Sequence, residues 1–240
     1  PRMSEHLVKS YEGELEGIST NVAQMGGIAE ALLQGAIDAL QRRDSALADR
    51  MIESDRRIDD LERVIEGQAV KVLALRQPVG VDLRLTVTAL RIANEIERIG
   101  DLAKNIAKRA LVLNREQPVR LTQGLVRMGR DVLGQIKAVL DAYAARDAEA
   151  AMAVWRKDEE IDELYNSIFR ELLTYMMEDP RTISLATHLL FVAKNLERAG
   201  DHATNIAEQV FYLTRGNYIG EDRPKGDATA SSNVPFEAAS

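Results

Sequence analysis

Cysteine is absent from this sequence of 240 residues. Its absence excludes disulfides, cysteine-ligated zinc sites, iron–sulfur clusters and thiol catalysis. Aromatic residues are also scarce, at 5% of a chain that is 45% hydrophobic and 29% charged. A composition poor in aromatics and rich in Ala, Leu, Glu and Arg favours helices over a β-sandwich or a β-barrel.

Positive charge is in short supply, because 31 Lys and Arg stand against 38 Asp and Glu and give a net charge of −7. Nucleic-acid binding relies on a basic surface, so we expect no nucleic-acid partner. No run of about 18 apolar residues occurs, and no basic stretch followed by an apolar one opens the chain as a signal peptide would. We therefore expect a cytoplasmic protein.

Apolar residues recur at alternating intervals of three and four, for example across residues 92–113. This spacing places them in one stripe along a helix and is typical of long helices packed in a supercoiled bundle. Turn-like sequences interrupt the pattern in the first half of the chain at 42–45, 77–80 and 114–118. In the second half the same rhythm predicts helices over 120–145, 147–178 and 181–214.

The two halves are related by an internal repeat. Shifted by 100 positions, residues 92–110 and 192–210 are identical at nine of nineteen positions, where about one identity is expected by chance from average amino-acid usage. Shifted by 103 positions, the segments 44–61 and 147–164 share a second set of identities. The offset changes at the turn before the third helix, where short deletions are tolerated.

We therefore predict an all-α fold of two tandem, pseudo-symmetric three-helix bundles, with six long helices in left-handed bundle packing. The first bundle is predicted to span residues 5–114 and the second residues 119–215. Beyond residue 215 the periodicity stops and Gly, Pro, Ser, Ala and Asp predominate. Residues 216–240 are therefore predicted to form a flexible C-terminal tail.

Acidic residues recur in the repeat along with the core positions. Each half carries one acidic pair on its second helix and another on its third, with the two members four residues apart. The pairs are Asp55 with Asp59, Glu97 with Asp101, Asp158 with Asp162, and Glu197 with Asp201. Side chains four apart share a helix face, where like charges repel by about a few tenths of a kcal/mol. A bound cation would remove that repulsion.

Two interpretations of these acids stay open. Carboxylate oxygens without sulfur suit Mg²⁺, Ca²⁺, Mn²⁺ or iron, so the acids are candidate metal ligands. Alternatively, they form a solvated face whose charges are paired with basic neighbours, namely Arg56, Arg57, Arg98 and Lys104. Four residues that flank the acids in both halves are candidates to contact and orient them: Arg98, Asn105, Arg198 and Asn205.

Gly100 and Gly200 stand in the middle of predicted helices, at a cost of about 1 kcal/mol relative to alanine. Their paired placement indicates either the close approach of a backbone or an ion beside Asp101 and Asp201, or close packing between helices. Both explanations stay open at this point.

Enzymatic motifs are missing from the sequence. It contains no G-x-x-x-x-G-K-[ST] phosphate loop, no G-x-S-x-G nucleophile turn and no H-E-x-x-H metal motif. We therefore predict that the protein is not an enzyme. A carboxylate-bridged metal protein with a hydrolytic or redox role, and a purely structural helical scaffold, are kept as alternatives.

Several motifs together resemble a known family. Gln77-Pro78-Val79 is followed by Asp82-Leu83-Arg84, and the pattern E-R-x-G-D-x-A-x-N-I-A occurs at both 97–107 and 197–207. These motifs and their order closely resemble the PhoU family of phosphate-uptake regulators. The resemblance covers about residues 5–215.

The resemblance implies a cytoplasmic regulator of phosphate homeostasis that restrains phosphate uptake and phosphate-starvation signalling. Members of the family act with the ATPase subunit of the phosphate ABC transporter and with a sensor histidine kinase, so they are peripheral to the inner membrane through their partners. They are usually homodimers. Some carry multinuclear clusters of iron, zinc, manganese or magnesium on acid-x-x-x-Asp motifs, which in this sequence correspond to the four acidic pairs.

Overall fold

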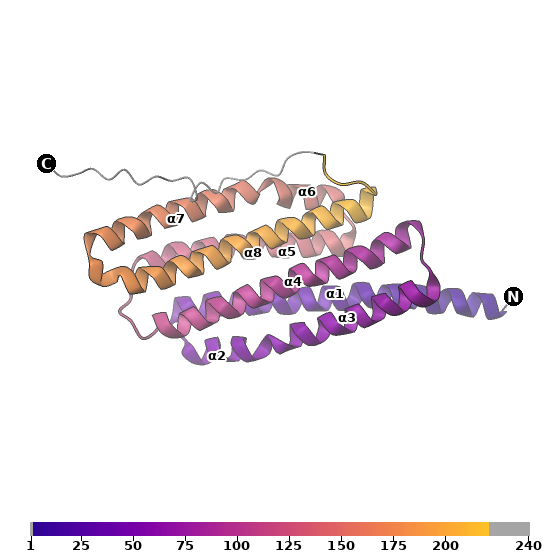
Figure 1. Cartoon of the computed structure of the whole chain (residues 1–240), viewed down its shortest axis with the longest axis horizontal. Helices are drawn as coiled ribbons and strands as arrows, with labels where there is room; N and C mark the ends of the chain where they lie inside the picture. Colours follow the sequence, from indigo (N-terminus) through magenta and orange to yellow (C-terminus); the bar gives the residue numbers. More distant parts are fainter. Residues whose placement is uncertain (1, 221–240) are drawn as a thin grey trace.

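The structure, a computed structural model, describes residues 2–220, with side chains described from residue 9 onward. It consists of helices, and the described residues contain no strand. The elements are α1 (Arg2–Arg42), α2 (Ser45–Ser54), α3 (Arg56–Arg76), α4 (Gly80–Leu113), α5 (Leu121–Ala145), α6 (Ala148–Arg156), α7 (Asp158–Glu178), the 3₁₀ turn η1 (Pro180–Thr182) and α8 (Ile183–Arg215). Helices α1–α4 form one bundle, and α5–α8 form a second bundle beside it (Figure 1). The predicted all-α fold of two tandem bundles is confirmed.

Each bundle contains three rods, which are α1, α2 with α3, and α4 in the first bundle and α5, α6 with α7, and α8 in the second. The second rod of each bundle is interrupted at one residue, which the sequence did not predict. Asp55 separates α2 from α3, and Lys157 separates α6 from α7. Turn hydrogen bonds bridge both interruptions, from Ile58 N to Asp55 O at 2.9 Å and from Glu160 N to Lys157 O at 3.1 Å. Each bundle therefore still consists of three rods.

The turns between the first and second rods are built alike in the two halves. Arg43 and Arg146 both adopt the left-handed conformation, with φ of 57° and 51°. The next residue then caps the following helix. Asp44 accepts a hydrogen bond from Leu47 N, and Asp147 accepts one from Ala150 N. An N-terminal aspartate satisfies backbone N–H groups that have no partner within the helix.

The core follows the apolar stripes expected from the sequence. In α4, Ile92, Ile96, Ile99 and Ile106 are each 1% exposed or less. Helix α4 packs against α1 and α8, and α8 in turn packs against α5, α6 and α7, so α4 and α8 join the two bundles through one continuous core. Among the described residues, no helix is both long enough and apolar enough to cross a bilayer.

Helix packing explains the paired glycines. A Cβ atom at Gly100 would lie 2.6 Å from Ile58 Cδ1, and one at Gly200 would lie 3.3 Å from Ile161 Cγ2. Ile58 and Ile161 occupy equivalent positions of the repeat, and both are buried. The glycines therefore let the second rod of each bundle approach the third closely.

Helices α4 and α8 run antiparallel where the two bundles meet. Glu95 of α4 accepts a hydrogen bond from Asn205 Nδ2 at 3.0 Å, and its Oε2 lies 2.6 Å from His202 Nδ1. Farther along, Arg109 Nη1 lies 3.0 Å from His188 Nδ1. Residue numbers rise on one helix as they fall on the other, as expected for two halves related by a pseudo-two-fold axis.

The chain leaves α8 through a glycine turn. Gly216 has φ of 80°, and its N–H donates to Tyr212 O at 2.9 Å. Tyr218 then folds back, because its ring stacks on Tyr212 at 4.4 Å and its hydroxyl accepts a hydrogen bond from Arg91 Nη1 at 2.9 Å. Of the predicted tail, residues 221–240 lie outside the described residues.

Candidate functional site

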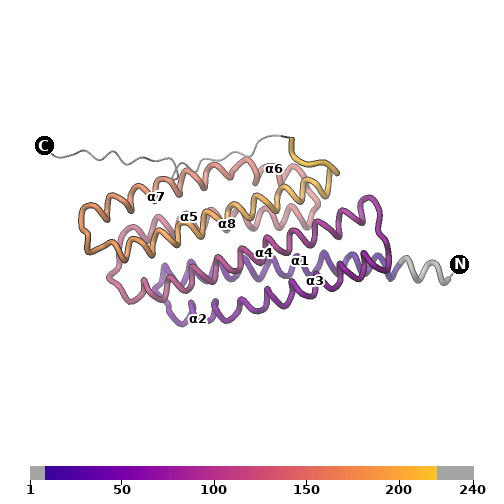
Figure 2. Tube along the Cα trace, in the orientation of Figure 1, coloured from indigo at the N-terminus to yellow at the C-terminus, as the bar shows by residue number. Residues whose placement is uncertain are grey.

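The acidic pairs lie where the interrupted rod of each bundle packs against the third helix. Helices α2 and α3 run along one outer edge of the molecule and α6 and α7 along the opposite edge, with α4 and α8 between them (Figure 2). Asp55 is the interrupting residue itself, and Asp158 follows the interruption at Lys157. The structure therefore brings together the predicted acids of each half as one group per bundle.

The acidic group of the first bundle contains its own cation. Lys104 Nζ of α4 lies 2.5 Å from Asp55 Oδ2 and 3.7 Å from Asp101 Oδ1. The side chain of Asp55 is 4% exposed, so this ion pair is largely shielded from water. Burial, followed by the negative charge of Asp55, raises the pKa of Asp59. Lys104 thus offsets part of the negative charge that the three aspartates concentrate here.

Glu97 is the most perturbed acid of this first group. Burial, followed by the negative charge of Asp101, raises the pKa of Glu97 to about 7. Arg98 Nε lies 3.5 Å from Glu97 Oε2, but the side chain of Arg98 is 54% exposed. Glu62 of α3 also raises the pKa of Glu97. Sequence reasoning missed Glu62, because its place beside α4 depends on how the two helices pack.

The acidic group of the second bundle is more deeply buried. Asp158, Asp162 and Glu197 are 2%, 3% and 5% exposed. Thr204 donates to Asp158 Oδ1 at 2.8 Å, and Lys194 Nζ lies 3.0 Å from Glu197 Oε2. Burial is the main reason why the pKa of Glu197 is raised, and the nearby positive charge of Lys194 opposes it.

The remaining candidates occupy varied surroundings. Arg198 and Asn105 are exposed, and Asn205 donates to Glu95 across the contact between the bundles. Of the basic residues considered for a solvated face, Lys104 and Arg98 pair with acids, whereas Arg56 and Arg57 are exposed and make no ion pair among the described residues.

The acidic group of the second bundle contains a buried carboxylate oxygen whose chemistry suits a cation. Glu197 Oε2 is fully buried and accepts no well-aligned hydrogen bond among the described residues, although Lys194 is close. In the first group, by contrast, the ammonium of Lys104 already contacts two carboxylates. Across residues 9–220, no three carboxylate or imidazole groups converge in the arrangement of a preformed metal site. Carboxylates would have to move to bind an ion.

Both halves of the chain match one family model. The model, described as the PhoU domain, matches residues 22–110 and again residues 125–210. The two matched segments correspond to the two bundles.

Curated relatives match nearly the whole chain. The phosphate-specific transport system accessory protein PhoU homolog of Caulobacter vibrioides (strain NA1000 / CB15N) is 54% identical over 226 residues, which cover 94% of this chain and 98% of the relative. The phosphate-specific transport system accessory protein PhoU of Escherichia coli (strain K12) is 39% identical over 223 residues, which cover 92% of each chain.

Solved structures share the fold. The crystal structure of PhoU from Pseudomonas aeruginosa matches with a TM-score of 0.84 at 40% identity, covering 86% of this chain and 100% of that chain. The phosphate transport system regulatory protein PhoU from Streptococcus pneumoniae matches with a TM-score of 0.81 at 28% identity, covering 88% of this chain and 100% of that chain.

Proposed function

Because this chain belongs to the PhoU family, we propose that it regulates phosphate uptake as an accessory protein of a phosphate-specific transporter. The observation that carries the proposal is the match of both bundles, over 94% of this chain and 98% of a relative named for that role. The relatives are named as accessory proteins, and the sequence lacks the catalytic motifs sought above. Regulation through contact with other proteins is consistent with both facts.

We further propose that the regulation is negative. In this proposal the protein is a cytoplasmic homodimer that contacts the ATPase subunit of the transporter and the sensor histidine kinase. The test is a strain that lacks only this gene, grown in phosphate-rich medium. Phosphate-starvation genes are expected to stay on and to be repressed again when the wild-type gene is restored. Normal repression in the deletion strain would refute the proposal.

The turn between α3 and α4 is the surface that we propose for the transporter contact. Val79 is 80% exposed, Leu75 69% and Val81 50%. Exposed apolar side chains gathered at one place are typical of protein interaction sites. Val79→Asp is expected to weaken co-purification with the ATPase subunit at least tenfold. Val64→Asp, which changes a half-exposed valine in the middle of α3, is the control and is expected to leave binding unchanged.

We also propose that the acidic group of the second bundle binds a divalent cation, which would be iron, zinc, manganese or magnesium. Asp158, Asp162, Glu197 and Asp201 would supply the oxygens, and the bound ion would neutralise this group, in which all but Asp201 are buried. The first bundle's acids are proposed as a second metal site. In each group a lysine competes with the ion, Lys104 in the first bundle and Lys194 in the second.

Metal content tests this proposal directly. Protein purified without chelators is analysed by mass spectrometry for metal per chain. Asp162→Asn/Glu197→Gln is expected to lose the metal. The control Glu159→Gln/Glu163→Gln removes two exposed carboxylates from α7 and is expected to keep it. Metal-free wild-type protein, or equal metal in both variants, would refute the metal site and leave the regulatory role untouched.

A further inference from the structure

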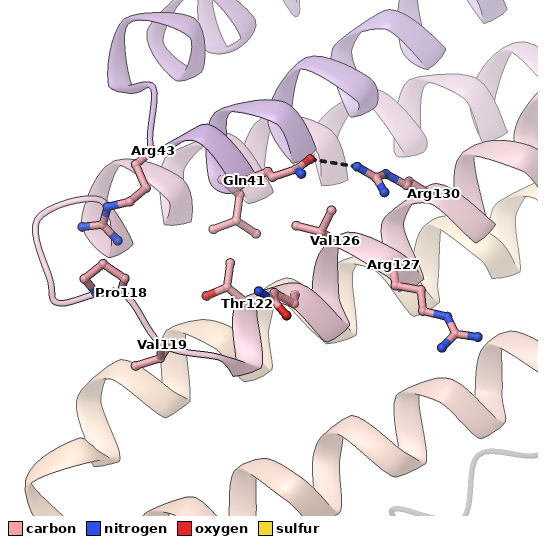
Figure 3. Close-up of a pocket in the computed structure, with 10 residues that line it drawn as sticks. Gln41, Arg43, Pro118, Val119, Thr122, Val126, Arg127 and Arg130 are labelled. Carbon is pink, nitrogen blue, oxygen red and sulfur yellow. Dashed lines mark hydrogen bonds between the residues drawn. The ribbon is translucent and has the colours of Figure 1, made fainter.

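A hollow of about 450 Å³ lies at the linker that joins the two bundles. It opens between the C-terminal end of α1, the linker residues 118–119 and the first turns of α5 (Figure 3). Pro118 and Val119 supply accessible apolar lining, whereas Leu40 and Val126 are buried, at 4% and 6% exposed. The volume is in the range of small-molecule sites, about 300–1,000 Å³, and it is far larger than a single inorganic phosphate needs.

The charge of this hollow is opposite to that of the protein as a whole. Its lining includes Arg43, Arg127 and Arg130 and no carboxylate, although acids outnumber bases in the chain by 38 to 31. Arg43 lies on one side, with Arg127 and Arg130 on the other (Figure 3). Three guanidinium groups around an apolar surface favour an anion, and their planar geometry suits phosphate or carboxylate oxygens.

The arginines retain donors for a ligand. Arg43 donates through Nη2 to the backbone oxygens of Asn114 and Glu116, and Arg130 donates through Nη2 to Gln41 Oε1 at 3.0 Å. A guanidinium carries five N–H donors, so both keep their Nε and Nη1 hydrogens for another partner. Arg127 is exposed and makes no hydrogen bond or ion pair among the described residues.

We propose that this hollow binds an organic phosphate of nucleotide size. The phosphate groups pair with the guanidinium groups, and the ring or other apolar part of the ligand covers Pro118 and Val119. An inorganic anion alone would leave this apolar surface exposed to water, whereas an uncharged ring would leave the arginines without an anion. The site does not involve the acidic groups, and the inference does not depend on the proposed regulatory function.

Such a ligand would contact both bundles at once. Arg43 follows α1 of the first bundle, and Arg127 and Arg130 belong to α5 of the second. Arg43 also holds the linker through the carbonyls of Asn114 and Glu116. Binding is therefore expected to stabilise the junction between the bundles.

Calorimetric titration of the full chain with ADP tests the proposal, with adenosine and inorganic phosphate as partial ligands. ADP is expected to bind at least tenfold more tightly than either and to bind more weakly as salt increases. Arg127→Glu/Arg130→Glu is expected to weaken ADP binding at least tenfold. Arg50→Glu/Arg63→Glu makes the same charge change at exposed arginines of α2 and α3 and is expected to bind ADP like the wild type. All four substituted positions are exposed, and circular dichroism verifies the fold.

Three results would overturn the inference. The first is no heat of binding with millimolar ADP, and the second is equal ADP affinity in the two double variants. The third comes from a parallel arm with phosphatidylglycerol vesicles. Vesicle binding that requires Arg127 and Arg130, without binding of ADP, would assign the hollow to a lipid headgroup.

Discussion

The two bundles carry the same four acids, but Lys104 lies among those of the first bundle and Thr204 takes the equivalent place in the second. The ammonium of Lys104 contacts Asp55 and Asp101, whereas the hydroxyl of Thr204 donates one hydrogen bond to Asp158. A hydroxyl brings no net charge, so Thr204 does not neutralise Asp158 as Lys104 neutralises Asp55. One side chain on the third helix thus makes two repeated sites electrostatically different.

At a second pair of equivalent positions, the lysine belongs to the second bundle instead of the first. Lys194 lies beside Glu197 in the second bundle, and Asn94 takes its place in the first. Each bundle therefore has one lysine from its third helix, but at a different end of its acidic group. Glu97 lacks a lysine at the equivalent position, and its pKa rises to about 7. The two halves of the repeat therefore share the acids and differ in the side chains that pair with them.

The largest effect is expected from removing the cation of the first group. Lys104→Met leaves Asp55 buried without its ion-pair partner, which is expected to lower the free energy of unfolding by about 3 kcal/mol. Urea unfolding at pH 7 in the presence of a chelator measures the loss. Lys108→Met, at an exposed position of the same helix, is the control, and a loss equal to that of the control would show that the ion pair contributes nothing.

The next effect concerns pH. The pKa of Glu97 in the folded protein, about 7, exceeds its ordinary value of 4.5. The folded state therefore binds a proton that the unfolded state releases, and stability falls as pH rises between these two values. After allowance for solvent screening of this partly exposed group, we expect a loss of about 1–2 kcal/mol between pH 5 and pH 7.

Glu97→Gln tests whether Glu97 causes this fall of stability with pH, because glutamine does not titrate. Its unfolding free energy, measured by urea denaturation across this pH range, is expected to fall less than that of the wild type. Glu53→Gln on the exposed face of α2 should retain the full slope. An unchanged slope in Glu97→Gln would place the titration elsewhere.

A smaller effect is expected from the hydroxyl that distinguishes the second group. Thr204→Val keeps the shape of a fully buried side chain but removes the donor to Asp158, at an expected cost of about 1.5 kcal/mol. Thr187→Val, which removes an exposed hydroxyl bonded to Ile183 O, is the reference. Thermal unfolding of both variants gives the comparison, and equal melting temperatures would contradict it.

The smallest effect is expected at Arg98, the arginine of the repeated motif in the first bundle. Arg98 is about half exposed and lies 3.5 Å from Glu97. Ion pairs in water contribute little, so Arg98→Ala is expected to change the unfolding free energy by less than about 0.5 kcal/mol. A loss well above 1 kcal/mol in urea unfolding would show that this arginine does more than screen a surface charge.

The spacing of apolar residues and the internal repeat were sufficient to predict the bundles, because both can be counted directly along the sequence. The stripe across 92–113 became the core of α4, and the repeat shift of 100 residues became the relation between α4 and α8. The predicted turn at 42–45 and the predicted helix start at 147 coincide with the turns that Asp44 and Asp147 cap, whereas the interruptions at Asp55 and Lys157 left no comparable signal.

The surroundings of the acids could not be predicted in the same way. That Lys104 contacts Asp55, 49 residues away, depends on the rotation of α4 against the second rod. Gln135 is another example. It is buried at the position where the first half has Leu32, and it donates to Lys157 O at 3.1 Å, where α6 ends. The sequence shows that a polar residue stands at an apolar position of the repeat, but it does not show which group that residue will hydrogen-bond.

The antiparallel contact of α4 with α8 also fixes how far apart two partners would stand. Helix α4 has 34 residues, which at 1.5 Å per residue is about 51 Å. The α3–α4 turn lies at one end of the molecule, and the α7–α8 turn, with exposed Met177 and Ile183, lies at the other (Figure 1). The molecule is therefore a spacer of nearly fixed length. Two proteins held at its ends gain affinity from their link only if their own surfaces are separated by a similar span.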